Sequence, residues 1–307
     1  GASAARRALA SPPPPLDAEA TEDELLRADV RAQVANYDEW ACAAADDVVV
    51  LDNLDGTVRA NFIPALTNGL PRFRAAYAAC VSSPLVGTNA LAVVRVFRER
   101  AVVHLHHVCR SREEYLAYVG TEQKWTAAIW SPLRRELVLY LPESGTDKLL
   151  RTVWHEAFHQ YLAYAGAMIT SAPWFNEGHA QLFEHAHFGR DGGIVFERND
   201  RAAAYVRAYA ADLAEILPDV MEMDYRAFYA GTQDEIAAKY FLAWSIAYFL
   251  EVGAPNLRFQ PYASLRADYL KALVETRSMH AATRAVLGDE KSRDAFVAAW
   301  LAFWRES

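Results

Sequence analysis

Residues 155–185 read HEAFHQYLAYAGAMITSAPWFNEGHAQLFEH, and this stretch decides how the rest of the chain is interpreted. Its apolar residues, several of them aromatic, recur at the three- and four-residue spacing of a buried helix. Gly166 and Pro173 interrupt the pattern, because glycine commonly ends a helix and proline suits a first helical turn. The stretch therefore predicts two helices, over residues 147–165 and 173–187, joined by a turn that brings the second back against the first.

The first of these helices carries two histidines four residues apart. His155 and His159 therefore lie on one helical face, where two imidazoles are able to bind the same metal ion. Glu177 lies near the start of the second helix, and seventeen residues, 160–176, separate it from His159. Two histidines and one glutamate are a common ligand set for a catalytic zinc. Bulky neighbours indicate burial, which is costly for such side chains without a partner. We therefore predict one zinc ion per chain, bound by His155, His159 and Glu177.

Two further glutamates belong to the same stretch. Glu156 directly follows the first histidine, where its carboxylate would hold a water molecule beside the metal and act as the general base. Glu184 lies seven residues after Glu177, two helical turns along the same face. We expect Glu184 to accept a hydrogen bond from a ligand imidazole, which would orient that ring. The alternative is a surface glutamate with no role at the site.

The motifs resemble those of a known group of enzymes. HEAFH, residues 155–159, matches the HExxH pattern, and WFNEGHAQLFEH, residues 174–185, is similar to the WLNEG-type second helix of gluzincin metallopeptidases. The similarity is greatest to aminopeptidases of the aminopeptidase N type and to their epoxide-hydrolase relative. The motif match covers residues 151–185. The wider layout resembles bacterial peptidase-MA-like domains of unknown function, in which a short mixed sheet precedes HExxH and a helical tail follows.

This resemblance implies a gluzincin-type zinc metallopeptidase with a thermolysin-like fold, in which the zinc cleft lies between a sheet subdomain and a helical one. It also implies a tyrosine on a later helix that donates a hydrogen bond to the oxyanion. Tyr240 is the candidate, with Tyr248 and Tyr229 as alternatives. The aminopeptidases usually have one residue more between the second histidine and the glutamate. No GxMEN motif lies upstream, so their specificity for amino termini is not implied.

The remainder of the chain predicts an α+β protein. Before residue 146 we expect strands over residues 48–51, 91–97, 125–130 and 136–141, and the last two should form a hairpin. A helix is expected over residues 111–119. Residues 60–80 have helical spacing, which Pro64 and Pro71 interrupt. Beyond the quoted stretch, helices are expected over residues 201–216, 233–252, 262–276 and 293–305. The predicted organisation is a flexible Pro- and Ala-rich lead (1–24), a mixed α/β subdomain (25–145) and a helical subdomain (146–307).

The composition argues against several classes of protein. A formal net charge of −8 with no basic cluster argues against a nucleic-acid partner. The longest apolar stretch, residues 240–250, is too short to span a membrane, which takes about 20 apolar residues. Three cysteines without CxxC spacing indicate buried thiols, and a bridge between Cys80 and Cys109 is the alternative. The Pro-rich lead favours an exported protein of the periplasm, cell envelope or extracellular space, while a cytoplasmic location stays open.

Taken with the resemblance, these residues predict zinc-dependent hydrolysis of a peptide or protein substrate. Glu156 would take a proton from the attacking water and pass it to the leaving amine. By analogy with the family, an extended peptide would pair with the strand over residues 126–130. Two alternatives remain: a binding or scaffolding protein that retains zinc without turnover, and a hydrolase of a non-peptide substrate.

Overall fold

The computed structural model of the chain describes residues 41–45, 48–52, 54, 56–82, 92–98, 110–121, 126–132, 136–141, 146–255 and 257–307. The lead predicted over residues 1–24 lies outside these ranges. The chain divides into two compact units. The first unit contains the described residues of Gly1–Phe73 and Thr88–Val153. The second unit contains the described residues of Arg74–Gly87 and Trp154–Ser307.

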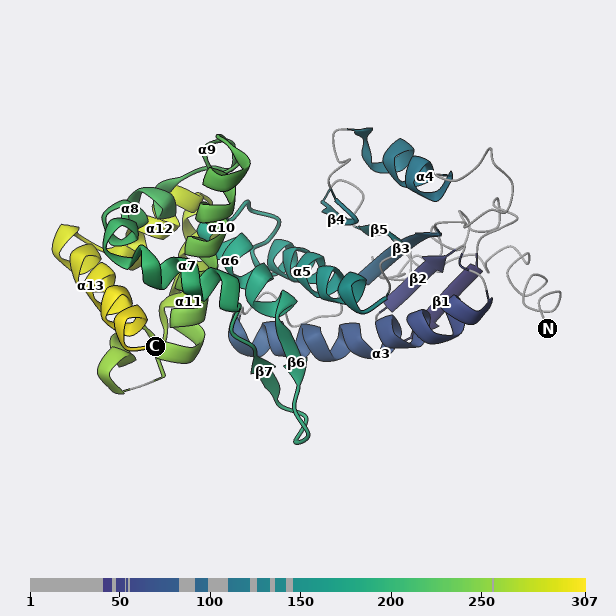
Figure 1. Ribbon diagram of the computed structural model, residues 1–307, viewed down its shortest axis with the longest axis horizontal. Coiled ribbons are helices and arrows are strands. Elements are labelled where there is room, and N and C mark those ends of the chain that lie inside the picture. The colour runs from purple at the N-terminus through teal and green to yellow at the C-terminus, as the bar shows by residue number, and fades with distance from the viewer. Residues whose placement is uncertain are drawn as a thin grey trace. The chain divides into compact units, whose positions relative to one another are not determined.

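The first unit contains a five-stranded mixed sheet with the order β1-β2-β3-β5-β4 (Figure 1). Its strands are β1 (Ala41–Ala45), β2 (Val48–Asp52), β3 (Ala92–Arg98), β4 (Ala128–Ser131) and β5 (Glu136–Leu141). β3 runs parallel to both of its neighbours, whereas β1–β2 and β4–β5 are antiparallel. The predicted hairpin is thus confirmed, and β4 lies at an edge of the sheet. The predictions missed β1, whose sequence ACAAA favours a helix by propensity but pairs with β2.

Helix α4 (Arg110–Val119) packs against this sheet. Tyr115 and Val138 of β5 are both fully buried, and Leu116, Val119, Ile129 and Tyr140 pack around them. The Tyr115 hydroxyl hydrogen-bonds Thr126 Oγ1 at 2.6 Å, so the polar end of this buried ring is satisfied.

The sequence predicted that Pro64 and Pro71 interrupt the helical spacing of residues 60–80. In the structure, helix α3 (Gly56–Cys80) instead runs without a break through both prolines. Each proline removes one helical hydrogen bond. The buried stripe of the helix continues through both positions, with Phe62, Leu66, Leu70 and Tyr77 at most 1% exposed, while Pro64 lies on the exposed side. Burial of four large apolar side chains, at about 1.5–3 kcal/mol each, outweighs the two lost hydrogen bonds.

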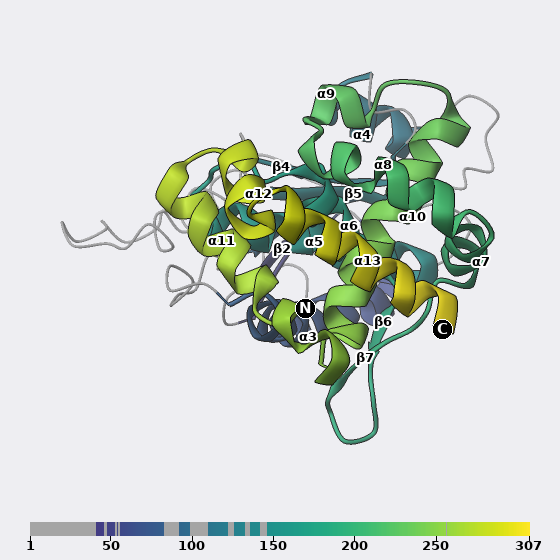
Figure 2. The ribbon, with the colours of Figure 1, turned by 90° about the vertical axis from the view of Figure 1, so that its left-hand side faces the viewer.

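The described residues of the second unit are helical apart from one hairpin and the connecting turns. Its helices are α5 (Thr146–Ala165, from Trp154 onward), α6 (Pro173–Glu184), α7 (Asp200–Ala208), α8 (Ala210–Glu222), α9 (Tyr225–Phe228), α10 (Gln233–Tyr248), a π-helical turn (Phe249–Gly253), a 3-10 segment (Leu257–Tyr262), α11 (Leu265–Thr276), α12 (Met279–Leu287) and α13 (Glu290–Glu306). Figure 2 shows α11, α12 and α13 together in this unit. In its coarse class the protein is therefore α+β, mostly helical with small sheets.

Several elements in this unit differ from the predictions. Helix α6 ends at Glu184 rather than near residue 187, and a two-stranded hairpin follows, β6 (Ala186–Phe188) and β7 (Ile194–Phe196). Gly192 in its turn adopts a φ of +82°, which only glycine accommodates easily. The helix predicted over residues 201–216 is two helices, because Tyr209 leaves the helical region with φ −119° and ψ 21°. Figures 1 and 2 both show the hairpin extending beyond the helices of its unit.

The turn between α5 and α6 sets how the two helices meet. Ala167 and Met168 both adopt left-handed conformations, with φ of 54° and 59°, and so reverse the chain after Gly166. The backbone N–H of Ala172 then donates to the Tyr269 hydroxyl at 2.7 Å, and Trp174 Nε1 donates to Thr283 Oγ1 at 3.1 Å. These contacts fix the start of α6 against later helices, and thereby the position of its fifth residue, Glu177.

Two further expectations concern cysteine and the membrane. Cys80 is a free, buried cysteine whose thiol donates to Glu251 Oε2 at 3.2 Å, and burial raises its pKa to about 11. Cys109, its alternative partner, lies outside the described residues. Within the described part of the chain, no helix has the length and apolar character needed to cross a membrane.

Candidate metal centre

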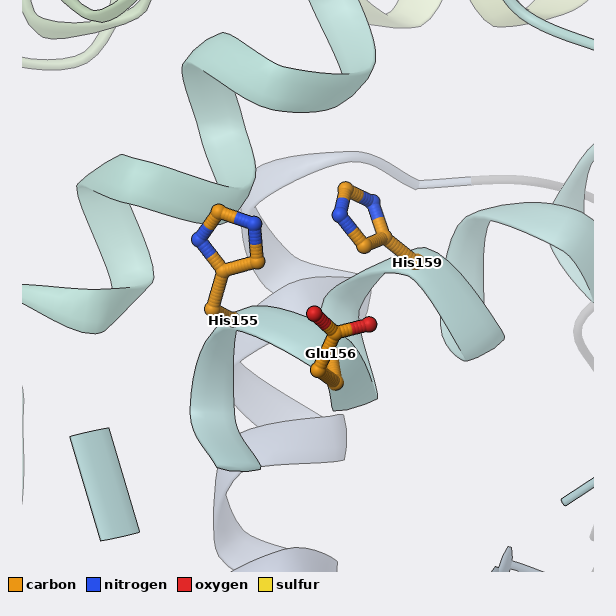
Figure 3. A group of neighbouring side chains, drawn as sticks. All are labelled: His155, Glu156 and His159. Carbon is orange, nitrogen blue, oxygen red and sulfur yellow. The ribbon is translucent and has the colours of Figure 1, made fainter. Parts of the chain in front are cut away.

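The centre is built on one face of α5. His155, Glu156 and His159 each offer a ligand atom, and these atoms lie within 4.8 Å of one another (Figure 3). The two imidazole rings stand side by side, with centroids 4.8 Å apart and planes at 84°. The helical spacing of four residues places both rings on the same side, as the HExxH pattern predicts. A group that could hold a metal ion is therefore present.

Glu177 of α6 meets the same two histidines. Its Oε2 atom lies 3.5 Å from His155 Nε2 and 3.6 Å from His159 Nε2. These separations are long for hydrogen bonds but suit two atoms that share a metal. Two ligands at about 2.1 Å from a tetrahedral zinc would be about 3.4 Å apart. The side chains of His155, His159 and Glu177, which we call the ligand triad, are thus spaced as three ligands of one metal ion would be, and Glu156 is the adjacent carboxylate.

The outer nitrogen of each histidine has an acceptor. His155 Nδ1 lies 3.1 Å from Glu184 Oε2, and His159 Nδ1 lies 2.7 Å from Asn176 Oδ1. Each acceptor holds a proton on Nδ1 and so turns Nε2, the nitrogen that would bind a metal ion, towards Glu177 Oε2. Residues of α6 therefore fix the orientation of both rings.

Tyrosines surround the opposite side of Glu177. The Tyr229 hydroxyl donates to Glu177 Oε1 at 2.7 Å, and the Tyr240 hydroxyl donates to that of Tyr229 at 3.4 Å. The Tyr225 hydroxyl accepts from Asn176 Nδ2 at 2.5 Å. The structure thus places Tyr240 beside the centre, one hydroxyl removed from Glu177. Tyr248 instead packs against Trp244, with ring centroids 5.0 Å apart, in the aromatic core of α10 and α13.

Two of these residues, Asn176 and Tyr225, were not identified from the sequence. Asn176 directly precedes Glu177 in the quoted motif, so its position next to a ligand was the available signal. Tyr225 and Tyr229 gave no comparable signal, because α9 has only four residues and no pattern predicts it. Tyr229 was named only as an alternative oxyanion donor.

Charge is strongly coupled within the centre. Burial alone would raise the pKa of Glu177, but His159, His155 and the Tyr229 hydroxyl lower it to about 2. Burial alone would lower the pKa of His155, but Glu177, Glu184 and Glu156 raise it well above its ordinary value. Buried carboxylates therefore require a positive charge among them, which a divalent cation supplies as well as a proton does.

A comparison with known protein families matches the segment that contains the centre, and the matching family has no known function. A family described as "Protein of unknown function (DUF1570)" matches residues 149–256, from the HExxH helix to the end of the π-helical turn. The match includes the ligand triad, Glu156, Glu184 and all of the tyrosines that surround the centre. No curated protein matches the chain. Over residues 149–256 the chain is therefore similar to the DUF1570 family.

Proposed function

We propose that this protein is a zinc-dependent hydrolase of peptide bonds, of the gluzincin type. One observation carries the proposal: the Nε2 atoms of His155 and His159 converge on a single oxygen of Glu177, at 3.5 and 3.6 Å. The outer hydrogen bonds of both rings support it, because ligand histidines ordinarily donate their other N–H to a carboxylate or a carbonyl oxygen. Three protein ligands are typical of catalytic zinc sites, whereas structural sites ordinarily have four.

A zinc ion held by the triad would supply Lewis acidity and lower the pKa of a water molecule to about 7. Glu156 lies on the same helix as both histidines, and its carboxylate is near their ring nitrogens. It is therefore the residue that would take a proton from the attacking water and deliver it to the leaving amine. Glu184 keeps the ring of His155 in its orientation throughout, since its hydrogen bond lies on the outer nitrogen.

Tyr240 is proposed as the donor to the oxyanion of the reacting carbonyl. Tyr229 already donates its proton to Glu177, so its hydroxyl is engaged, whereas the 3.4 Å contact from Tyr240 is long and easily exchanged for a substrate oxygen. For the substrate, we propose a peptide or protein bound in extended conformation.

The test compares the wild-type chain with two variants. Zinc content is measured after purification, and cleavage of a peptide library is profiled with and without a chelator. Glu156→Gln should retain about one zinc per chain and lose hydrolysis. The double variant His155→Ala/His159→Ala should lose both.

Glu215→Gln is the matched control, because Glu215 is an exposed glutamate on α8. It should leave zinc content and hydrolysis unchanged. Full zinc occupancy in the double variant would refute the ligand assignment. A Glu156→Gln enzyme that cleaves a validated peptide at the wild-type rate would refute the role of Glu156.

A further inference from the structure

Helix α9 contributes two tyrosines that lie next to the ligand triad. Tyr225 is its first residue and Tyr229 directly follows its last, so the two side chains are four residues apart and share one helical face. Their hydroxyl groups bond to consecutive residues of α6, Tyr225 to Asn176 and Tyr229 to Glu177. We call Tyr225 and Tyr229 the tyrosine clip.

Tyr229 distinguishes the two oxygens of Glu177. Oε1 accepts the Tyr229 proton at 2.7 Å, while Oε2 faces both histidine Nε2 atoms. The terminal torsion of a glutamate is otherwise broad and roughly two-fold, so either oxygen, or both together, could turn towards a metal. The hydrogen bond from Tyr229 therefore favours coordination through Oε2 alone.

Tyr225 orients His159 indirectly, through the side-chain amide of Asn176. Asn176 donates from Nδ2 to the Tyr225 hydroxyl at 2.5 Å and accepts at Oδ1 from His159 Nδ1 at 2.7 Å. The contact to Tyr225 thus keeps the oxygen of the amide turned towards the histidine. As a consequence His159 carries its proton on Nδ1 and presents Nε2 to the triad.

The clip is anchored by contacts outside the triad. A helix of four residues has little stability of its own. Asp224 caps its start by accepting from Ala227 N at 2.8 Å, and Lys239 of α10 donates to the carbonyl oxygens of Ala227 and Ala230 at 2.8 and 2.7 Å. Phe228, between the two tyrosines, is fully buried. The hydroxyl groups are therefore held in place by contacts that need no metal.

We propose that Tyr225 and Tyr229 are positioning residues that preorganise the triad for a four-coordinate cation, by selecting the coordinating oxygen of Glu177 and the coordinating nitrogen of His159. The inference rests on the proposed function, since it presupposes that the triad binds zinc. It assigns to α9 a role in metal affinity and coordination geometry, whereas Tyr240 is assigned to the reacting carbonyl.

The experiment uses Tyr225→Phe and Tyr229→Phe in the full chain, with Tyr209→Phe as the matched control. Tyr209 is 51% exposed, and its ring packs against that of Tyr205. Zn²⁺ affinity is measured by chelator competition, and the visible spectrum of the Co²⁺-substituted protein reports coordination geometry. Loss of an outer hydrogen bond to a metal ligand typically costs 10–100-fold in affinity. Each clip variant should show a loss of that size, and Tyr229→Phe should also change the Co²⁺ spectrum.

The outcomes separate this inference from the proposed function. Tight Zn²⁺ binding by the wild type, with both clip variants within twofold of it, would overturn the clip and leave the proposed function intact. A wild-type chain that binds no Zn²⁺ would overturn the proposed function, and the clip with it. The metal-free unfolding temperature should match the wild type in Tyr209→Phe and fall by no more than a few degrees in each clip variant, which loses one hydrogen bond. A loss of affinity accompanied by an equal loss of metal-free stability would mark a merely structural role and also overturn the clip.

Discussion

Substitution of Gly178 by alanine tests how closely α6 packs against α10. Gly178 directly follows Glu177 of the proposed ligand triad and is buried in the middle of α6. A Cβ at this position would lie 2.8 Å from the carbonyl carbon of Ala243 and nearer still to its oxygen. Both are backbone atoms of α10, and the side chain of Ala247 lies 3.4 Å away. No flexible group can move aside, so the two helices must separate.

The size of the effect follows from two opposing contributions. Carbon atoms in contact prefer about 3.5 Å, so the helices must part by about 0.7 Å locally. Forcing extra atoms into a packed core costs about 1–3 kcal/mol, and a backbone-to-backbone clash belongs at the upper end. Alanine regains about 1 kcal/mol through its better helix propensity. The net loss is about 2 kcal/mol in the free energy of unfolding, or roughly 4–8 °C in melting temperature.

The assay is thermal unfolding of the metal-free chain, followed by chelator competition for Zn²⁺. Gly178→Ala should unfold at the lower temperature and bind Zn²⁺ more weakly, because the adjacent Glu177 moves with α6. Gly56→Ala is the control, since a Cβ at Gly56 would have no heavy atom within 4 Å. It should be neutral or slightly stabilising. A Gly178→Ala protein that is as stable as the wild type would refute the close approach of α6 and α10.

Three further predictions concern separate features of the chain. The Tyr240→Phe variant should keep its zinc, and its kcat should fall about a hundred- to a thousandfold. This is the loss of about 2.7–4 kcal/mol expected when an oxyanion donor is removed. A near-normal kcat in steady-state assays would transfer the role to Tyr229 or leave the metal as sole electrophile. Binding to DNA or RNA should be negligible at physiological salt, because the net charge is −8, and tight salt-sensitive binding in a fluorescence titration would contradict this. Because burial raises the pKa of Cys80 to about 11, only about one part in a thousand of this thiol should be thiolate at pH 8. Cys80 should therefore react slowly with iodoacetamide, as measured by peptide mapping with mass spectrometry. Rapid labelling of the folded chain would argue against its burial.

Prediction from the sequence succeeded where the structure depends on neighbouring residues. The hairpin of β4 and β5 follows from two apolar runs separated by a short turn. Helix α5 follows from its periodic apolar residues and the glycine that ends it. The β6–β7 hairpin was missed because its three-residue strands directly follow a strong helical pattern. The continuity of α3 through its prolines was missed because tertiary burial, rather than local propensity, decides it.

The same distinction applies to the candidate metal centre. The sequence by itself determined that His155 and His159 share a face with Glu156 beside them, because a spacing of four residues is one turn of any α-helix. The motif that followed indicated Glu177, although its contact with the histidines depends on how the turn between α5 and α6 folds, within the seventeen residues that separate His159 from Glu177.

Only the tertiary structure decided which groups surround the ligands. Tyr225 and Asn176 are separated by 49 positions in the chain, Tyr229 and Glu177 by 52, and the Tyr240 carbonyl and Gln181 Nε2, which hydrogen-bond at 3.0 Å, by 59. Contacts at such separations depend on the packing of α9 and α10 against α6. That packing is set by side-chain shape and burial across the whole unit, and no local repeat in the sequence encodes it.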